Sequence, residues 1–222
     1  MRFDSKTRYL QLAFNGSLAS AERIIPMLPS HDRILVEAGT PFIKRYGQSG
    51  IRRMADLWDG RVVADLKTCD GAAEEVALAG NAGAAAATVL GSVPTETLDF
   101  FVAKCKSSAM WSMIDMLGVD EPWRVLMCMR QPPDVVVLHK GRDEESTRGK
   151  VIQYKNVNKI RSKFDVLISA AGGVDLKEAR SAIFNGANIV VVNIVEPGDP
   201  WTGISTASNV SKIAEQFLAT IE

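Results

Sequence analysis

The sequence has no excess of charge of either sign, since 26 lysine and arginine residues balance 26 aspartate and glutamate residues. This balance argues against a nonspecific binder of nucleic acid, which normally carries a basic excess. No apolar run approaches the ~20 residues that a membrane-spanning helix needs. The charged N-terminal segment MRFDSKTRYL lacks the apolar stretch of a signal peptide, so we expect a cytoplasmic protein with no membrane partner.

Cysteine is scarce as well. The 3 cysteines, Cys69, Cys105 and Cys128, are widely spaced and form no C-x-x-C pair. We therefore expect neither a disulfide framework nor a cysteine-based zinc site. Hydrophobic residues nonetheless make up 46% of the 222 residues, which is enough to bury a core without such cross-links.

Short apolar runs recur along the whole chain, and their starts lie about 23 to 31 residues apart. This spacing suits a buried strand followed by a covering helix. The predicted strands are Tyr9–Phe14, Ile34–Ala38, Val62–Asp65, Ala86–Leu90, Trp111–Asp115, Val135–Leu138, Val166–Ala170 and Ile189–Val192. The predicted helices are Leu18–Met27, Gln48–Trp58, Ala72–Ala82, Thr95–Ser107, Glu121–Met129, Asn156–Lys163, Leu176–Asn185 and Ser205–Ile221.

This alternation predicts an α/β protein whose fold is a (β/α)8 TIM barrel. A doubly wound open sheet is the alternative, because it is also built from strands that alternate with helices. No linker, low-complexity tract or charge block divides the chain. We therefore expect residues 1–222 to form a single domain.

Polar and ionisable side chains follow the predicted strands, at the end where a barrel of this kind carries its chemistry. In chain order they are Asn15, Glu37, Asp65, Lys67, Ser92, Asp115, His139, Ser169 and Asn193. Burying several unpaired charges is costly, so their convergence favours a functional site. A purely structural network of ion pairs is the alternative.

The densest cluster is Asp65-Leu-Lys-Thr-Cys-Asp70. Asp65 and Lys67 are two residues apart, so in a strand their side chains share one face, and Asp70 lies just beyond in the following loop. A lysine between two carboxylates is held protonated, which suits a proton donor or a cation that stabilises an oxyanion. Glu37 and Asp65 offer two hard oxygen ligands for Mg²⁺, although a plain salt bridge is the alternative.

Val63-Ala-Asp-Leu-Lys-Thr-Cys-Asp-Gly71 resembles the Asp-x-Lys-x-x-Asp motif of the orotidine 5′-monophosphate decarboxylase suprafamily. Four further elements are similar to the branch that contains 3-hexulose-6-phosphate synthase and 3-keto-L-gulonate-6-phosphate decarboxylase. These elements are Val36-Glu-Ala-Gly-Thr-Pro41, Ala87-Thr-Val-Leu-Gly91, His139 and Ala171-Gly-Gly-Val174. Because the matches fall on several predicted strands, the resemblance covers most of the chain.

The resemblance implies a homodimer with shared active sites, in which Asp70 projects toward the partner subunit's lysine. It also implies that Glu37 and Asp65 bind Mg²⁺ and that Lys67 supplies positive charge to an enediolate of a sugar phosphate. His139 and Arg142 would move or position the proton at the reacting carbon. The substrate-binding residues would be Asn15, Glu37, Gly172, Gly173 and Asn193.

Two positions depart from the family pattern. Asn15 stands where the family usually has an aspartate, and the segment 192–204 lacks the Gly-Arg or Gly-Gly pair that commonly holds phosphate. The amides of Gly172 and Gly173, and those near Gly203–Ser205, are the expected replacements as phosphate donors.

The function that we expect is a Mg²⁺-dependent lyase or synthase that joins formaldehyde to ribulose 5-phosphate. One alternative is a decarboxylase of 3-keto-L-gulonate 6-phosphate or orotidine 5′-phosphate. Another is a noncatalytic barrel that binds a metabolite.

Overall fold

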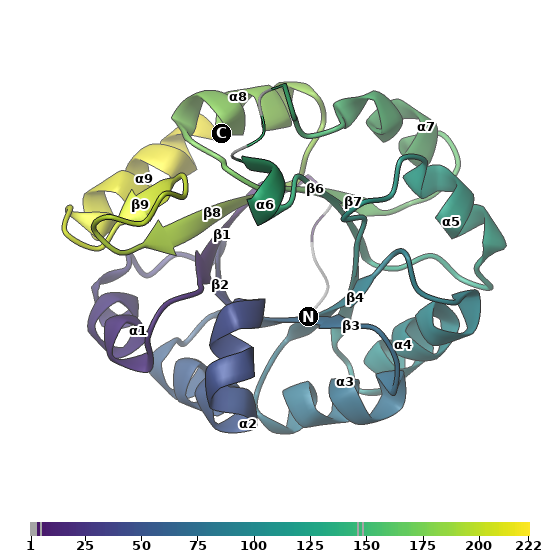
Figure 1. The fold of residues 1–222 in the computed structure, drawn as a ribbon, viewed down its shortest axis with the longest axis horizontal. Coiled ribbons are helices and arrows are strands. Elements are labelled where there is room, and N and C mark those ends of the chain that lie inside the picture. The colour runs from purple at the N-terminus through teal and green to yellow at the C-terminus, as the bar shows by residue number, and fades with distance from the viewer. Residues whose placement is uncertain (1–3, 5, 146, 148) are drawn as a thin grey trace.

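The protein is a closed barrel of parallel strands surrounded by helices (Figure 1). The structure is a computed structural model that describes residues 4, 6–145, 147 and 149–222. Strands β1 to β8 each pair with the next in chain order, and β8 also pairs with β1. The pairing of the first strand with the eighth confirms the predicted (β/α)8 barrel and excludes the open sheet.

The strands agree with the predicted ones to within a few residues. They are β1 (Tyr9–Phe14), β2 (Ile34–Ala38), β3 (Arg61–Thr68), β4 (Ala86–Leu90), β5 (Trp111–Asp115), β6 (Val135–His139), β7 (Leu167–Ala171), β8 (Ile189–Val195) and the unpredicted β9 (Gly203–Ser205). The α-helices are α1 (Leu18–Ile24), α2 (Thr40–Leu57), α3 (Ala72–Asn81), α4 (Thr95–Ser107), α5 (Pro122–Cys128), α6 (Arg142–Glu145), α7 (Val157–Arg161), α8 (Leu176–Phe184) and α9 (Val210–Thr220). Short 3₁₀ turns are η1 (Ile25–Met27) and η2 (Tyr154–Asn156).

The apolar side chains form two separate cores because successive residues of a strand point to opposite faces. In β1, Leu10, Leu12 and Phe14 belong to the layer between the strands and the helices. Tyr9 and Ala13 belong to the smaller core inside the barrel, which also contains Leu35, Val63, Ala86, Trp111, Met113, Val135, Val137, Leu167, Ala171, Ile189 and Val191. The interior of the barrel below its mouth is therefore filled mainly by apolar side chains.

Helix α2 starts earlier than predicted. The predicted helix began at Gln48. Gly47 has φ +56° and ψ −147°, which is not helical, so α2 consists of two helical parts that meet at a kink, and the second part begins where the prediction placed it. The first part of α2, from Thr40 to the kink, lies beside β2 at the edge of the barrel (Figure 1).

The last helix starts later than predicted. Residues Gly203–Ser205 form β9, which pairs with the end of β8, and α9 begins only at Val210. Asn209 caps α9 by accepting a hydrogen bond from the backbone N–H of Lys212. Gly203–Ser205 are thus not a helix N-terminus, so the expectation that a helix start there supplies phosphate donors is wrong.

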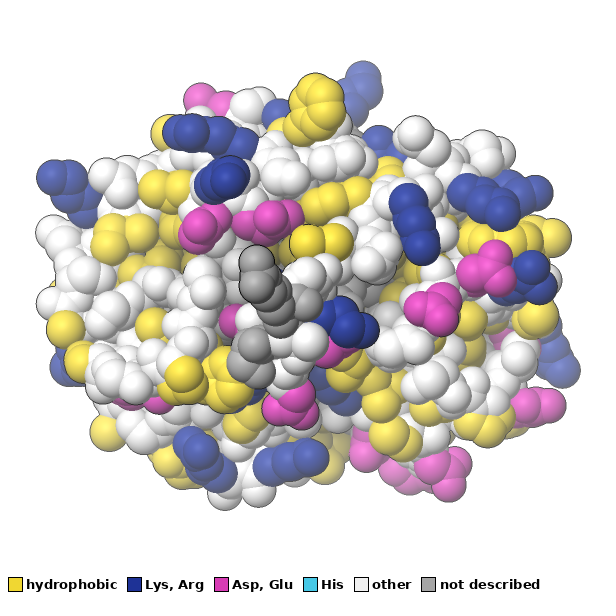
Figure 2. Space-filling model, turned by 45° about the horizontal axis from the view of Figure 1, so that its top comes forward, with side chains coloured by type: hydrophobic (Ala, Val, Ile, Leu, Met, Phe, Trp, Pro, Cys, Tyr) yellow, Lys and Arg dark blue, Asp and Glu magenta, His cyan; other side chains and the backbone are white. Residues whose placement is uncertain are grey.

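The described surface shows no concentration of one charge sign on the face drawn in Figure 2, where acidic and basic side chains are interspersed. This distribution agrees with the formal net charge of zero. Within the described residues, no helix is long and apolar enough to cross a membrane.

Candidate active site

A pocket of about 410 Å³ opens at the C-terminal ends of the strands, and each strand of the closed barrel contributes to its lining. We call it the barrel-mouth pocket. The strand residues are Gln11, Ala13, Glu37, Asp65, Lys67, Thr88, Met113, Asp115, Val137, His139, Ala171, Val191 and Asn193. The loops and α6 add Asn15, Arg142 and Gly172. Most of the predicted side chains therefore converge in one cavity, and Asp70, Ser92, Ser169 and Gly173 are the exceptions.

Lys67 lies between two carboxylates of the same chain. Its Nζ is 2.7 Å from Asp65 Oδ2 and 2.9 Å from Asp115 Oδ2. Burial disfavours the ammonium, but the two negative charges outweigh burial and raise the pKa of Lys67 above its ordinary value. The lysine is therefore a fixed positive charge inside the pocket.

The backbone at Lys67 is unusual. The register between β3 and β4 shifts between Ala64 and Thr68, and Lys67 has φ +46°, a conformation that costs a non-glycine residue about 1 kcal/mol. Its backbone N–H donates to Thr88 Oγ1 over 2.9 Å, which holds this conformation. The side chains of Asp65 and Lys67 both line the pocket, as predicted. They do so because the end of β3 is distorted, and not because side chains of a regular strand alternate between its faces.

Asp115 joins the lysine to the histidine. Its Oδ2 accepts a hydrogen bond of 2.8 Å from His139 Nδ1, and its Oδ1 accepts one from the backbone N–H of Leu117. Burial alone would raise the pKa of Asp115, yet the charges of His139 and Lys67 hold it well below its ordinary value. Asp115 is thus ionised and fixed, and it determines the orientation of both cations.

His139 is buried, and burial alone would lower its pKa. The charge and the hydrogen bond of Asp115 outweigh burial, so the pKa of His139 is raised above its ordinary value. Because Nδ1 is bound to Asp115, the other ring nitrogen, Nε2, is the one that can exchange a proton with a ligand. The protonated ring is a potential acid at neutral pH.

Asp65 and Glu37 line the pocket from neighbouring strands. Asp65 Oδ2 accepts from Thr40 Oγ1, and its Oδ1 accepts from Thr88 Oγ1, each over 2.8 Å. Glu37 accepts a hydrogen bond from the amide Nε2 of Gln11. Burial, reinforced by the negative charge of Asp65, raises the pKa of Glu37 to about 7.

These two carboxylates fit a hard divalent cation. The raised pKa of Glu37 shows that its negative charge is poorly compensated, and a cation between Glu37 and Asp65 would compensate it. Gln11 Oε1 is a further hard oxygen, buried and without a hydrogen-bond partner among the described residues. Within those residues no group of 3 or more His, Cys, Asp and Glu side chains could hold a metal, so substrate oxygens or water would have to complete its coordination.

Asp70 is exposed and does not line the pocket. The second carboxylate beside Lys67 in the same chain is Asp115, not Asp70 as the spacing suggested. Asn15 and Asn193 do line the pocket, and Asn15 Nδ2 donates to Asn193 Oδ1 over 3.2 Å. Gly172 lines it with φ +103°, and a Cβ there would lie 1.9 Å from the carbonyl oxygen of Lys140.

The sequence placed Asp115 among the strand-end polar residues but indicated no specific role for it. It did not single out Gln11, Thr40 or Thr88 as site residues. Gln11 is a polar residue at an inward position of an otherwise apolar strand, which is also a readable signal. The two threonines gave none, because threonine is common in buried strands such as that of Thr88, and Thr40 is the first residue of α2.

The sequence matches the family model described as orotidine 5′-phosphate decarboxylase / HUMPS family over residues 8–200. A similar protein is the bifunctional enzyme Fae/Hps of Methanothrix thermoacetophila, which is 33% identical over 216 residues. That match covers 96% of this chain and 53% of the relative. The chain thus spans about half the length of the relatives that it matches.

Solved structures share the architecture. The structure of 3-hexulose-6-phosphate synthase from Salmonella typhimurium matches with a TM-score of 0.80 and 24% identity, covering 96% of this chain and 98% of that one. The structure of KGPDC from Streptococcus mutans matches with a TM-score of 0.76 and 18% identity over 96% of this chain and 97% of that one. At such identities these two likenesses show the fold.

Proposed function

The chain belongs to the orotidine 5′-phosphate decarboxylase / HUMPS family, and we propose that it is a Mg²⁺-dependent carbon–carbon lyase of the 3-hexulose-6-phosphate synthase type. It would join formaldehyde to ribulose 5-phosphate, or run the reverse cleavage. The observation that carries this proposal is Lys67, held between Asp65 and Asp115 in the pocket that also contains Glu37 and His139. The similarity to the Fae/Hps enzymes supports it.

Lys67 would stabilise the negative charge of the intermediate. In the synthetic direction C1 of ribulose 5-phosphate loses a proton, and the electron pair delocalises into the adjacent carbonyl to give an enediolate. The same carbon then attacks formaldehyde, whose oxygen takes up a proton. A permanent ammonium placed in advance lowers the energy of the enediolate more than that of the neutral ketone.

His139 would transfer the proton at the reacting carbon. In the cleavage direction formaldehyde leaves, and the carbon that held it must be protonated. Asp115 favours the protonated imidazole, which suits that step. Arg142 lines the same pocket and would position the substrate beside this ring.

Glu37 and Asp65 would hold Mg²⁺. When bound, the ion would supply Lewis-acid stabilisation to the substrate oxygens on which negative charge develops. Asn15, Gly172 and Asn193, which line the pocket, would bind the sugar. Gly173 lies beside them, next to Glu145 and Lys140.

Asp70 would complete the active site of a second subunit. It is exposed in the single chain, and an exposed carboxylate directly after the Lys67 strand is placed to reach a neighbouring chain. In a two-fold dimer each subunit would give its Asp70 to the partner and receive one in return. We therefore propose a homodimer with shared sites.

The test is to incubate the protein with 3-hexulose 6-phosphate and Mg²⁺ and to measure the formaldehyde released. We expect release that stops when EDTA removes the metal and that is lost in Lys67→Ala. No metal-dependent release by the wild-type protein would overturn the proposal.

A decarboxylase of 3-keto-L-gulonate 6-phosphate is the second candidate. The observation that favours it is Arg142, three residues after His139 and inside the pocket, an arrangement that resembles the decarboxylase. Both reactions proceed through an enediolate, so release of CO₂ from keto-gulonate phosphate, compared with release of formaldehyde, separates them. Decarboxylation of orotidine 5′-phosphate needs no metal and would survive EDTA.

A further inference from the structure

The end of β3 is irregular, and one residue of β4 faces the irregular segment. The two strands are in register up to Ala64 and again at Thr68, and between these positions β4 offers a single residue, Thr88. A regular ladder would pair the backbone N–H groups of the segment with the neighbouring strand, so an irregular segment needs other partners for them. Thr88 is only 4% exposed and lines the barrel-mouth pocket, which places its hydroxyl beside this segment.

The hydroxyl of Thr88 bridges two residues of the site. Its Oγ1 accepts a hydrogen bond of 2.9 Å from the backbone N–H of Lys67. The same oxygen lies 2.8 Å from Asp65 Oδ1. An ionised carboxylate can only accept, so the single proton of the hydroxyl is donated to Asp65. Because that proton is engaged within the protein, Thr88 does not donate to a ligand, although its side chain lines the pocket.

Lys67 needs support because its backbone is strained. Its φ of +46° lies in the left-handed region, which a residue with a side chain adopts only where neighbouring groups impose it. Ala109, the other non-glycine residue with positive φ among the described residues, lies between α4 and β5 at the far end of the strands. The strained residue inside the pocket is thus the one whose ammonium is central to the proposed chemistry, and Thr88 binds its backbone directly.

Asp65 is held from both neighbouring strands. Thr40 Oγ1, from the side of β2, lies 2.8 Å from the carbonyl oxygen of Asp65 and 2.8 Å from its Oδ2. Thr88 binds Oδ1 from the side of β4. Asp65 in turn lies 2.7 Å from Lys67 Nζ. Thr88 therefore acts on the lysine twice, through its backbone N–H and through the carboxylate that binds its ammonium.

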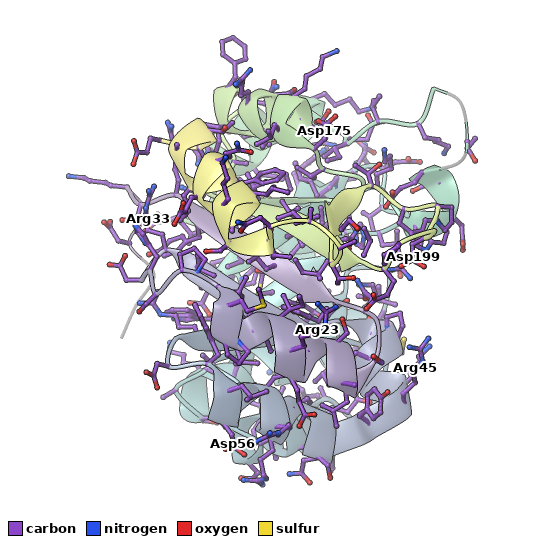
Figure 3. All side chains as sticks on the ribbon, turned by 90° about the vertical axis from the view of Figure 1, so that its left-hand side faces the viewer. Arg23, Arg33, Arg45, Asp56, Asp175 and Asp199 are labelled. Carbon is purple, nitrogen blue, oxygen red and sulfur yellow. The ribbon has the colours of Figure 1, made fainter. Side chains whose placement is uncertain are left out.

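The flank of β8 and β1 is held differently. There the exposed side chains of Arg45, on the first part of α2, and Arg23, on α1, donate to backbone carbonyl oxygens over 3.2 Å and 3.4 Å. Figure 3 labels both arginines, together with Asp199, on this flank, which lies across the barrel from β4 (Figure 1). These contacts join helices to loops at the rim, whereas Thr88 acts inside the pocket, on the strand that carries the lysine.

We propose that Thr88 is a positioning residue, whose hydroxyl holds Lys67 in its strained conformation and orients Asp65. The ammonium of Lys67 is thereby fixed where negative charge develops on the substrate. This inference rests on the proposed function for the reaction that Lys67 serves. The two hydrogen bonds of Thr88 do not depend on catalysis, so their role can be measured separately.

The test replaces the hydroxyl by groups of graded hydrogen-bonding strength. Thr88→Ser keeps the hydroxyl, and Thr88→Cys differs from it by one atom but is only a weak donor and acceptor. Thr88→Val keeps the shape of threonine and removes the hydroxyl. Thr68→Val is the matched control, because Thr68 is also buried and donates to the carboxylate of Glu75, and neither residue lines the pocket.

Two properties are measured for the wild type and each variant. The first is formaldehyde release from 3-hexulose 6-phosphate with Mg²⁺, resolved into kcat and KM. The second is the rate at which the backbone amide of Lys67 exchanges with D₂O, followed by NMR. Amide exchange reports the hydrogen bond to Thr88 without any turnover.

We expect kcat to decrease in the order Ser, Cys, Val at position 88, reaching a loss of about 10- to 100-fold in Thr88→Val, because a misplaced charge slows the chemical step. KM should stay within about threefold, since Thr88 does not bind the substrate. The amide of Lys67 should exchange about tenfold faster in Thr88→Val, because its acceptor is lost. Thr88→Ser should stay within about threefold of wild type, and Thr68→Val within about twofold.

The proposal is overturned if Thr88→Ser is as impaired as Thr88→Val, if Thr68→Val lowers kcat equally, or if the Lys67 amide exchanges at the same rate in all these proteins. A change in KM alone would also contradict it, because that is the effect of losing a substrate contact. If Thr88→Val does not fold, the comparison of Thr88→Ser with Thr88→Cys decides. If the wild type releases no formaldehyde, the proposed function fails, and amide exchange still shows whether Thr88 holds Lys67.

Discussion

The two sides of the barrel mouth hold their polar groups in different ways. On the side of β3, β5 and β6, Lys67, Asp115 and His139 form one buried chain of charge pairs, each 2.9 Å or less from the next. On the side of β1 and β8, Asn15 and Asn193 share an uncharged amide hydrogen bond, and the arginines lie farther out. The first side is built for charge stabilisation at a fixed point, and the second is built for binding.

The two sides of the barrel mouth therefore have different roles: one stabilises charge during the reaction, and the other binds the substrate. A buried ion network fails when one member is removed, because the others are left unpaired. Amides and exposed guanidinium groups, such as those of Arg23 and Arg45, can be changed with much smaller penalties. We therefore expect large catalytic effects from the first side and effects on affinity from the second.

The largest effect should follow Lys67→Ala. Removal of a preorganised charge at the oxyanion costs about 10²- to 10³-fold in kcat. The variant also leaves Asp65 and Asp115 without their common cation, so thermal unfolding should be followed alongside. Lys212→Ala, on the exposed face of α9, is the matched control and should be silent. Activity in Lys67→Ala above about a tenth of wild type would contradict this assignment.

The next effect concerns the proposed dimer. Asp70→Asn should lower kcat about 10²-fold, as removal of a positioned carboxylate does. Mixing this variant with Lys67→Ala should restore about one quarter of the wild-type sites, because half of the dimers are hybrids with one intact site each. The measurement is specific activity after joint refolding. Failure to recover activity, while the hybrid is shown to form, would place Asp70 outside the partner's site.

A smaller effect is expected for Asp115→Asn. The pKa of His139 is raised by the charge of Asp115, so this variant should lower it and move the corresponding limb of the kcat profile to lower pH. Protonated His139 stabilises the fold at pH values below its ordinary pKa, and that contribution is lost as pH rises through the raised value. The variant should therefore lose stability chiefly at acid to neutral pH.

Asp134 supplies the control for that experiment. It binds the hydroxyl of Ser112 over 2.8 Å at the other end of the strands and does not line the barrel-mouth pocket. Asp134→Asn should alter stability without shifting the pH profile of kcat. Equal shifts in both variants would mean that Asp115 acts only through the overall fold.

The smallest effect should come from Asn15→Asp, which restores the residue that the family usually has. The new carboxylate would face Asn193 Oδ1, the acceptor of the present hydrogen bond, and the Asn193 amide would have to turn. Because this side binds and does not supply charge, we expect kcat within about threefold of wild type and a change mainly in KM. A change in kcat above about tenfold would show that the two sides are not separate.

Much of the fold could be predicted from the sequence because the strands are short apolar runs at regular spacing, and β1, β2, β4 and β5 have the predicted ends. The errors lie where tertiary contacts overrule local signals. A helical part from Thr40 to the kink at Gly47 precedes the predicted helix, and Ser205 pairs with β8 where the pattern favoured the start of the last helix.

The residues of the site could be predicted from the sequence better than the contacts between them. Strand ends identified Glu37, Asp65, Lys67 and His139, since the barrel brings them together. Spacing could not show that Asp115 bridges the lysine and the histidine, because that contact joins three strands.

The most direct measurement is hydrogen exchange at C1 of ribulose 5-phosphate in D₂O, with Mg²⁺ and without formaldehyde, followed by NMR. If Lys67, between Asp65 and Asp115, stabilises an enediolate, the wild-type protein will incorporate deuterium at C1, and Lys67→Ala will not. Absence of exchange in the wild type, or equal exchange in Lys67→Ala, would contradict the central role given to this lysine.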